Sequence, residues 1–152
     1  GDKIPSIWKG EKIVRQPMEI NGKTYEVTLV NLGNPHCVVF CDKVDDIDVE
    51  TLGRAIECSK YFPQRTNVEF IRVVNDATIK MRVWERGNGE TLACGTGAAA
   101  AAVASVLNGY CKHDMDITVK VRGGDLMVNY NSDGRVILTG SVEKVFEGKV
   151  EF

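Results

Sequence analysis

The apolar and polar positions divide the chain into short segments that predict strands, separated by turn residues. Ile79, Met81 and Val83 alternate with polar side chains, which is typical of a strand with one buried face. We therefore predict a hairpin made of 67–74 and 78–84 around a turn at 75–77. Further apolar runs predict strands at 25–32, 37–41, 116–121, 126–130, 136–139 and 142–146.

Two segments have helical patterns. Asp48 is a residue type that caps helices, and the apolar spacing after it predicts a helix from 49 to about 58. The segment 98–107 is almost wholly alanine and valine, with Ser105 as its one polar side chain. Because it lacks a solvated face, it must be surrounded by protein, and it is shorter than the ~20 residues that cross a bilayer. Asn108 and Gly109 predict the helix end.

Alanine on every side of the helix 98–107 allows neighbouring strands to approach its axis closely. We therefore predict an α+β fold in which a mostly antiparallel sheet curls around this central buried helix. The 152 residues suit a single domain, 1–152, with a substantial core.

Composition excludes several classes of partner. The net charge is −2 with both signs interspersed, so no basic stripe for nucleic acid is present, and no segment suits a membrane span. The five cysteines form no CxxC pair and no zinc spacing, so we expect no metal site and a reducing cytosol. The chain begins with GDKIPS rather than methionine, as if it started within a longer protein.

Candidate chemistry centres on Cys94, which precedes a Gly-Thr-Gly turn and the predicted helix. The unpaired N–H groups and the positive dipole end of a helix start attract anions and favour a thiolate over a thiol. Gly95 and Gly97 lack side chains, so a carboxylate could approach the backbone of Gly95 and Thr96 closely. A buried cysteine before a glycine-tolerant helix start is the structural alternative.

Polar residues at other predicted strand ends could join Cys94 in one pocket. An arginine fork binds carboxylate, an asparagine can donate to carboxylate or accept from ammonium, and a glutamate can hold ammonium. Such a set suits a zwitterionic amino acid, although each member alone could be a solvated strand end, a turn residue or a satisfied loop histidine. The candidates are Asn34, His36, Asn67, Glu85 and Arg86.

Two chemistries could use these residues. Cys94 with His36 could form a hydrolase pair, but no motif supplies a third orienting group. Cys94 could instead exchange a proton at an amino-acid α-carbon. Inversion without a cofactor needs a second group on the opposite face, and the chain offers only one cysteine in such a setting.

Three motifs carry a family resemblance: GNPHCVVF at 33–40, RTNVEF at 65–70 and ERGNGETLACGTGA at 85–98. In this order they resemble the carboxyl-terminal half of diaminopimelate epimerase. The resemblance implies cofactor-independent interconversion of LL- and meso-diaminopimelate, on the route to lysine and peptidoglycan. It also implies two similar halves, each a sheet around a central helix, with the active site between them and the amino-terminal half absent from this chain.

The resemblance also implies roles for single residues. Cys94 would be one of two catalytic cysteines, and the other would belong to the amino-terminal half. His36 and Glu85 would be auxiliary catalytic groups, with their assignment to the two cysteines left open. Gly95 and Thr96 would present backbone amides to the reacting carboxylate. The distal end of the substrate would contact Asn34, Asn67, Glu85 and Arg86.

Other interpretations and partners remain open. A related amino-acid racemase or isomerase of the same fold group would share the Cys-Gly-Thr-Gly feature, and a non-enzymatic anion-binding or dimerising module would need no second half. The family usually forms homodimers, and 145–148 resembles a segment in which a tyrosine assists that contact. Phe146 keeps the ring and lacks the hydroxyl.

Overall fold

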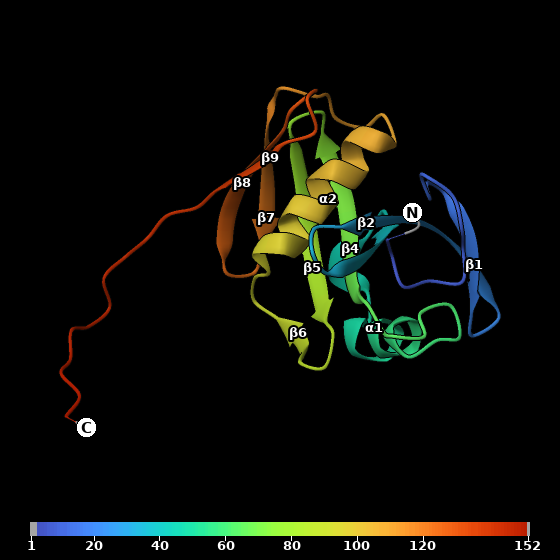
Figure 1. The fold of residues 1–152 in the computed structure, drawn as a ribbon, viewed down its shortest axis with the longest axis horizontal. Coiled ribbons are helices and arrows are strands. Elements are labelled where there is room, and N and C mark those ends of the chain that lie inside the picture. The colour runs from blue at the N-terminus through green and yellow to red at the C-terminus, as the bar shows by residue number, and fades with distance from the viewer. Residues whose placement is uncertain (1–2, 152) are drawn as a thin grey trace.

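The computed structural model describes residues 3–151, which form one nine-stranded sheet and two α-helices (Figure 1). The elements in chain order are β1 (Gln16–Ile20), β2 (Lys23–Asn31), β3 (Pro35–Phe40), the 3-10 turn η1 (Val44–Asp46), α1 (Val49–Glu57), β4 (Asn67–Asn75), β5 (Thr78–Glu85), β6 (Gly89–Thr91), α2 (Gly95–Leu107), β7 (Asp116–Val121), β8 (Gly124–Tyr130) and β9 (Val136–Thr139). The α+β prediction is confirmed.

The strand order is β1-β2-β3-β4-β5-β7-β8-β9, and β6 pairs with β5 off this path. Neighbouring strands are antiparallel except for β3 with β4 and β5 with β7. The predicted hairpin is present as β4 and β5, joined at the turn after Asn75. In the β3–β4 pair His36 lies beside Asn67, so a parallel register brings two predicted site residues together.

Helix α2 is the centre of one hydrophobic core. Residues 97–106 are all buried, and the helix packs against β2, β3, β4, β5, β7, β8 and β9. The sequence of this helix has no polar face, and this feature correctly predicted that the helix is buried. The helix begins earlier than predicted, at Gly95 with Cys94 as its N-cap, and Gly109 has the left-handed φ of 78° that ends it. Among residues 3–151, no helix is long and apolar enough to span a bilayer.

Helix α1 packs on the other side of the central strands and forms a second core. Asp48 caps it by accepting from the Thr51 N–H at 3.0 Å. Gly53 of α1 lies against Trp84, which packs in this second core. The adjacent residue of β5, Val83, packs in the α2 core on the opposite face. Since both faces of the central strands are covered, β3 and β4 contain continuous buried runs rather than alternating ones.

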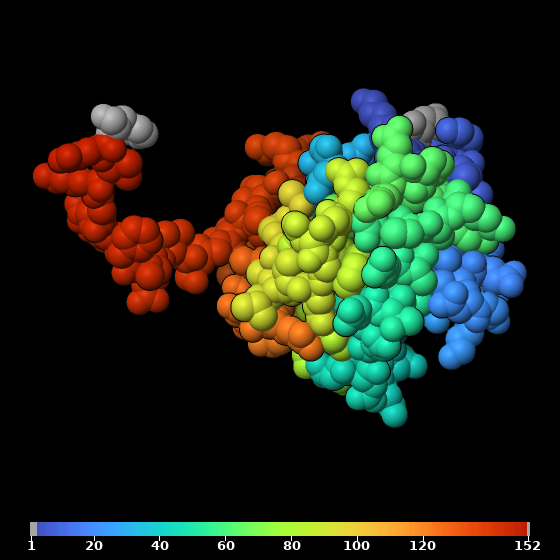
Figure 2. Space-filling model, turned by 90° about the horizontal axis from the view of Figure 1, so that it is seen from below, coloured from blue at the N-terminus to red at the C-terminus, as the bar shows by residue number. Residues whose placement is uncertain are grey.

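The predicted strand at 142–146 is wrong. This segment has no secondary structure, and its side chains are exposed, with Val142 at 97% and Phe146 at 83%. Residues 141–151 extend away from the body of the fold (Figures 1 and 2). A strand needs a hydrogen-bonded neighbour, and an apolar pattern alone does not supply one.

Candidate functional site

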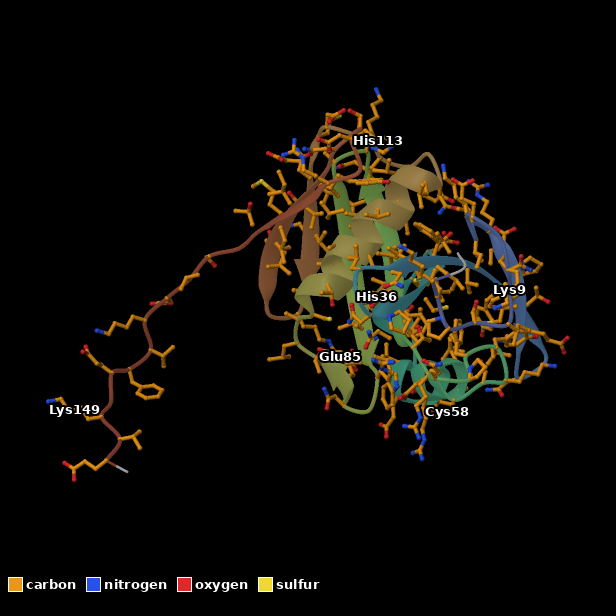
Figure 3. The ribbon with its side chains drawn as sticks, viewed as in Figure 1. Lys9, His36, Cys58, Glu85, His113 and Lys149 are labelled. Atoms are coloured by element: carbon orange, nitrogen blue, oxygen red, sulfur yellow. The ribbon has the colours of Figure 1, made fainter. Side chains whose placement is uncertain are left out.

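The predicted site residues gather at the amino-terminal end of α2. Asn34 precedes β3, Asn67 begins β4, Glu85 ends β5 and Arg86 follows it, so the candidates lie at the ends of three strands. A hydrogen bond from Asn34 Nδ2 to Thr96 Oγ1, at 3.3 Å, joins the β2–β3 loop to the first turn of α2. Figure 3 shows His36 and Glu85 on this side of the molecule.

Cys94 is a half-buried thiol that caps α2. Its Sγ accepts from the Gly97 N–H at 3.4 Å and lies 3.6 Å from Thr96 Oγ1. Burial raises the pKa of the Cys94 thiol above its usual value. Hydrogen bonds from Thr96 and Gly97 lower this pKa, whereas the charges of Glu85 and Glu69 raise it. This direction opposes the predicted preference for a thiolate, because burial outweighs the hydrogen bonds from Thr96 and Gly97.

His36 is fully buried, and both of its ring nitrogens have partners. Nδ1 lies 2.7 Å from Glu69 Oε1, and Nε2 lies 3.0 Å from Asn34 Oδ1. His36 is thus linked to Cys94 through Asn34 and Thr96. The sequence analysis missed Glu69, although a carboxylate inside the apolar run of β4 was a signal that could have found it.

Glu85 and Arg86 are held in different ways. The Thr91 hydroxyl donates to Glu85 Oε1 at 2.5 Å, and Glu85 is half-buried. Arg86 is exposed, and its Nη1 donates to the Gln64 carbonyl at 3.3 Å. The Arg86 backbone N–H donates to Asn67 Oδ1 at 2.8 Å. Buried Asn67 therefore fixes the backbone at Arg86, a role that the sequence analysis did not predict.

The first turn of α2 is suited to a carboxylate. The Gly97 N–H is directed at Cys94, whereas Gly95 and Thr96 contribute the earlier N–H groups, which have no partner within a helix. A Cβ at Gly97 would lie 3.0 Å from Glu69 Oε1 and 3.3 Å from Cys94 Sγ. Because Gly97 has no side chain, the Glu69 carboxylate and the Cys94 sulfur can both lie close to its Cα.

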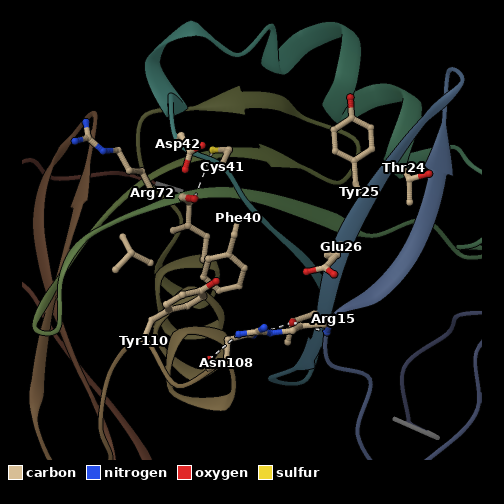
Figure 4. Close-up of a pocket in the computed structure, with 13 residues that line it drawn as sticks. Arg15, Thr24, Tyr25, Glu26, Phe40, Cys41, Asp42, Arg72, Asn108 and Tyr110 are labelled. Atoms are coloured by element: carbon tan, nitrogen blue, oxygen red, sulfur yellow. Dashed lines mark hydrogen bonds between the residues drawn. The ribbon is translucent and has the colours of Figure 1, made fainter.

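The predicted site is open to the surface, because Cys94 is half-buried and Thr96 and Arg86 are exposed. The groove of about 620 Å³ in Figure 4 lies near the other end of α2, where Phe40, Asn108 and Tyr110 contribute to its lining. Within residues 3–151, its lining includes none of the predicted site residues. The same part of the chain contains no group of three metal-ligating His, Cys, Asp or Glu side chains.

Comparison with known sequences matches residues 28–145 to the diaminopimelate epimerase family. The chain belongs to this family. Diaminopimelate epimerases from Leptospira biflexa and Nostoc punctiforme are 46% and 52% identical to it, over 97% and 92% of the chain. The chain covers 52% and 50% of these two relatives, so it spans about half the length of the diaminopimelate epimerases that it matches.

Solved structures support the fold of this diaminopimelate epimerase family member. A probable proline racemase from Agrobacterium radiobacter superposes with a TM-score of 0.56 at 13% identity, over 88% of this chain and 51% of the racemase. A phenazine biosynthesis protein of the PhzF family from Bacillus anthracis gives 0.51 at 21% identity, over 84% of this chain and 36% of that protein. At these identities the likeness concerns the fold alone.

Proposed function

We propose that this chain is the carboxyl-terminal half of a cofactor-independent diaminopimelate epimerase, which interconverts LL- and meso-diaminopimelate for lysine and peptidoglycan synthesis in the cytosol. The observation that carries the proposal is coverage: nearly the whole chain aligns with about half of each relative, and the half-buried thiol of Cys94 lies at the predicted site. We also infer that the sheet curls around α2. The contacts of α2 with strands from β2 to β9 support that geometry.

The proposed chemistry uses two cysteines on opposite faces of the α-carbon. The thiolate of a cysteine in the other half removes the α-proton, and the Cys94 S–H delivers its proton to the opposite face. The two sulfurs thereby exchange their thiol and thiolate states, and the reverse reaction restores them. The raised pKa of Cys94 supports the role of proton donor in this direction.

The remaining site residues would bind and poise the substrate. The N–H groups of Gly95 and Thr96 would hold the reacting carboxylate at the helix start. Arg86, Asn34 and Asn67 would contact the distal amino-acid end. Glu85 would contact the ammonium and serve as an auxiliary group for Cys94, a role supported by its effect of raising the pKa of that thiol. We propose His36 as the second auxiliary group.

The amino-terminal half would cover the open site. Exposed apolar side chains next to Cys94 support this: Leu92 is 67% exposed, and Leu138, which packs against Gly95, is 44% exposed. Without this cover, we expect the chain to lack epimerase activity. A homodimer is also proposed, with Phe146 at the contact, since this residue is 83% exposed.

The test is the exchange of the α-proton of LL-diaminopimelate in deuterated water, followed by NMR. The 152-residue chain should show no inversion, and a longer chain that adds the amino-terminal half should show inversion and exchange. Robust inversion by the 152-residue chain would overturn the two-cysteine proposal. In the longer chain Cys94→Ser should abolish turnover, whereas the matched control Cys58→Ser, at an exposed thiol, should not.

A second substitution separates binding from proton transfer. Arg86→Lys keeps the positive charge but loses the planar paired donors that fit a carboxylate, so we expect a raised KM. Proline in place of diaminopimelate tests the related racemase activity. If proline were the better substrate and Arg86→Lys changed nothing, the diaminopimelate assignment would be replaced by that of a related racemase.

A further inference from the structure

A buried carboxylate lies behind the site without a role in the chemistry described so far. Glu69 is 0% exposed within β4, between the apolar residues Val68 and Phe70. Its Oε1 lies 2.7 Å from His36 Nδ1, and its Oε2 is buried without a hydrogen-bond partner in residues 3–151. An unsatisfied buried carboxylate oxygen is costly, so packing alone does not explain this residue.

The hydrogen bonds around His36 determine where its protons lie. Asn34 Nδ2 donates to Thr96 Oγ1, so the Oδ1 of the same amide faces His36 Nε2 at 3.0 Å. A carbonyl oxygen only accepts, so Nε2 must carry a proton. The contact between His36 Nδ1 and Glu69 Oε1 then holds one further proton, shared by the pair. Burial raises the pKa of the Glu69 carboxyl, which favours keeping that proton.

The network continues from Asn34 to the sulfur. Thr96 Oγ1 accepts from Asn34, so its own hydroxyl proton is available to donate to Cys94 Sγ at 3.6 Å. Five side chains therefore form one connected path, in the order Glu69, His36, Asn34, Thr96 and Cys94. Reversing the Asn34 amide would turn its oxygen toward Thr96. The Thr96 hydroxyl would then donate its proton to that oxygen and no longer to the Cys94 sulfur.

We propose that Glu69 is a positioning residue, which shares a proton with His36 Nδ1 and thereby fixes the Asn34 amide and directs the Thr96 hydroxyl to Cys94. This inference rests on the proposed function in one respect, because it takes Cys94 as the reacting thiol. Its tests use no substrate, so they can fail or succeed whether or not the protein is an epimerase.

Nitrogen-15 NMR of the 152-residue chain tests the proton positions. The sequence has two histidines, and the exposed His113 provides a reference for the buried His36. Near pH 7 we expect His36 Nε2 to be protonated in the parent chain and in Glu69→Gln, because a glutamine N–H can donate to Nδ1 in place of the shared proton. An unprotonated Nε2 in the parent chain would overturn the proposal.

Alkylation with iodoacetamide followed by peptide mapping tests the path to the sulfur, with the exposed Cys58 as the internal reference. At pH 8 the Cys94-to-Cys58 ratio should fall roughly threefold to tenfold in Glu69→Leu, as expected for one lost hydrogen bond. The proton shared with His36 keeps the pair neutral overall, so removing the Glu69 carboxyl adds little opposing charge effect on Cys94. Thr96→Val should cause the same fall. The double variant should fall no further, because both substitutions interrupt one path. The proposal would be overturned if the fall in the double variant were the product of the two single falls. An unchanged ratio in Glu69→Leu would overturn it as well.

The conservative variant distinguishes positioning from packing. Glu69→Gln should keep the alkylation ratio within about twofold of the parent, because it preserves the bond to His36. If Glu69→Leu does not fold, Glu69→Gln and Thr96→Val still decide the question. A loss in Glu69→Gln as large as the loss in Thr96→Val would then refute the role.

Discussion

Glu57 is a second buried carboxylate, and it fixes the loop that carries Arg86. It lies at the end of α1 and is 3% exposed. The Trp84 indole N–H donates to Glu57 Oε2 at 2.6 Å, and the Gly87 backbone N–H donates to Oε1 at 3.0 Å. Since Arg86 lies between these two anchored residues, Glu57 connects α1 to the end of β5 and to the loop that follows it.

Glu57→Gln should weaken this anchor without changing its size. The amide retains one acceptor oxygen, but its NH₂ group must face one of the two N–H donors, so one part-buried hydrogen bond to a carboxylate is lost. Such a loss costs about 2 kcal/mol of the free energy of unfolding. For a chain of 152 residues this corresponds to a fall in Tm of about 4–8 °C. Glu57→Ala leaves both donors unpaired and should cost about 3–5 kcal/mol.

Thermal unfolding followed by circular dichroism measures the effect, and Trp84 fluorescence reports the local change. The matched control is Glu50→Gln, which removes an exposed carboxylate from the first turn of the same helix. We expect the control to cost less than about 0.5 kcal/mol. If the two glutamine variants had equal Tm values, the anchoring of the Arg86 loop by Glu57 would be refuted.

Four further predictions test the packing, the site and the tail. Gly53→Ala should cost about 3 kcal/mol in urea unfolding, since the new Cβ would lie 2.6 Å from the Trp84 Cβ, and a stability equal to the parent's would contradict this packing. Gly97→Ala should change Cys94 alkylation while leaving the circular dichroism spectrum intact, because its Cβ would lie 3.3 Å from the sulfur. Alkylation of Cys94 should rise with pH later than that of a small-molecule thiol, as its raised pKa requires, and an earlier rise would favour the thiolate interpretation. Deleting 141–152 should shift Tm by less than about 2 °C, because residues 141–151 are exposed, and a larger fall would show that the tail packs on the fold.

The sequence predicted the elements whose patterns depend on local physics. The hairpin of β4 and β5 followed from alternation, and the buried α2 followed from the missing polar face. The β1–β2 hairpin was missed, although its turn has the Asn21-Gly22 pair that favours a tight hairpin. Both turn residues have positive φ, 51° and 74°. The signal was present, but the strand before it contains Pro17 and few apolar residues.

Order in the sheet could not be predicted, because pairing depends on contacts between distant segments. The parallel pair of β3 and β4 is separated in sequence by α1 and its flanking loops, and it aligns His36 with Asn67. The short β6, which the sequence analysis did not predict, pairs back on β5. These pairings decide which strand ends meet α2, and they therefore decide the site.

The candidate site illustrates the difference between identifying residues and assigning their state. Motifs identified Asn34, His36 and Cys94, and the structure joins them by hydrogen bonds. The motifs did not show that Cys94 is half-buried, and burial raises its pKa more than the Gly97 N–H and the Thr96 hydroxyl lower it. In the proposed reaction, a Cys94 thiol that is protonated at rest becomes negatively charged only when it gives its proton to the substrate. The bonds from Gly97 and Thr96 then matter most, because both donate to the sulfur and strengthen when it is charged.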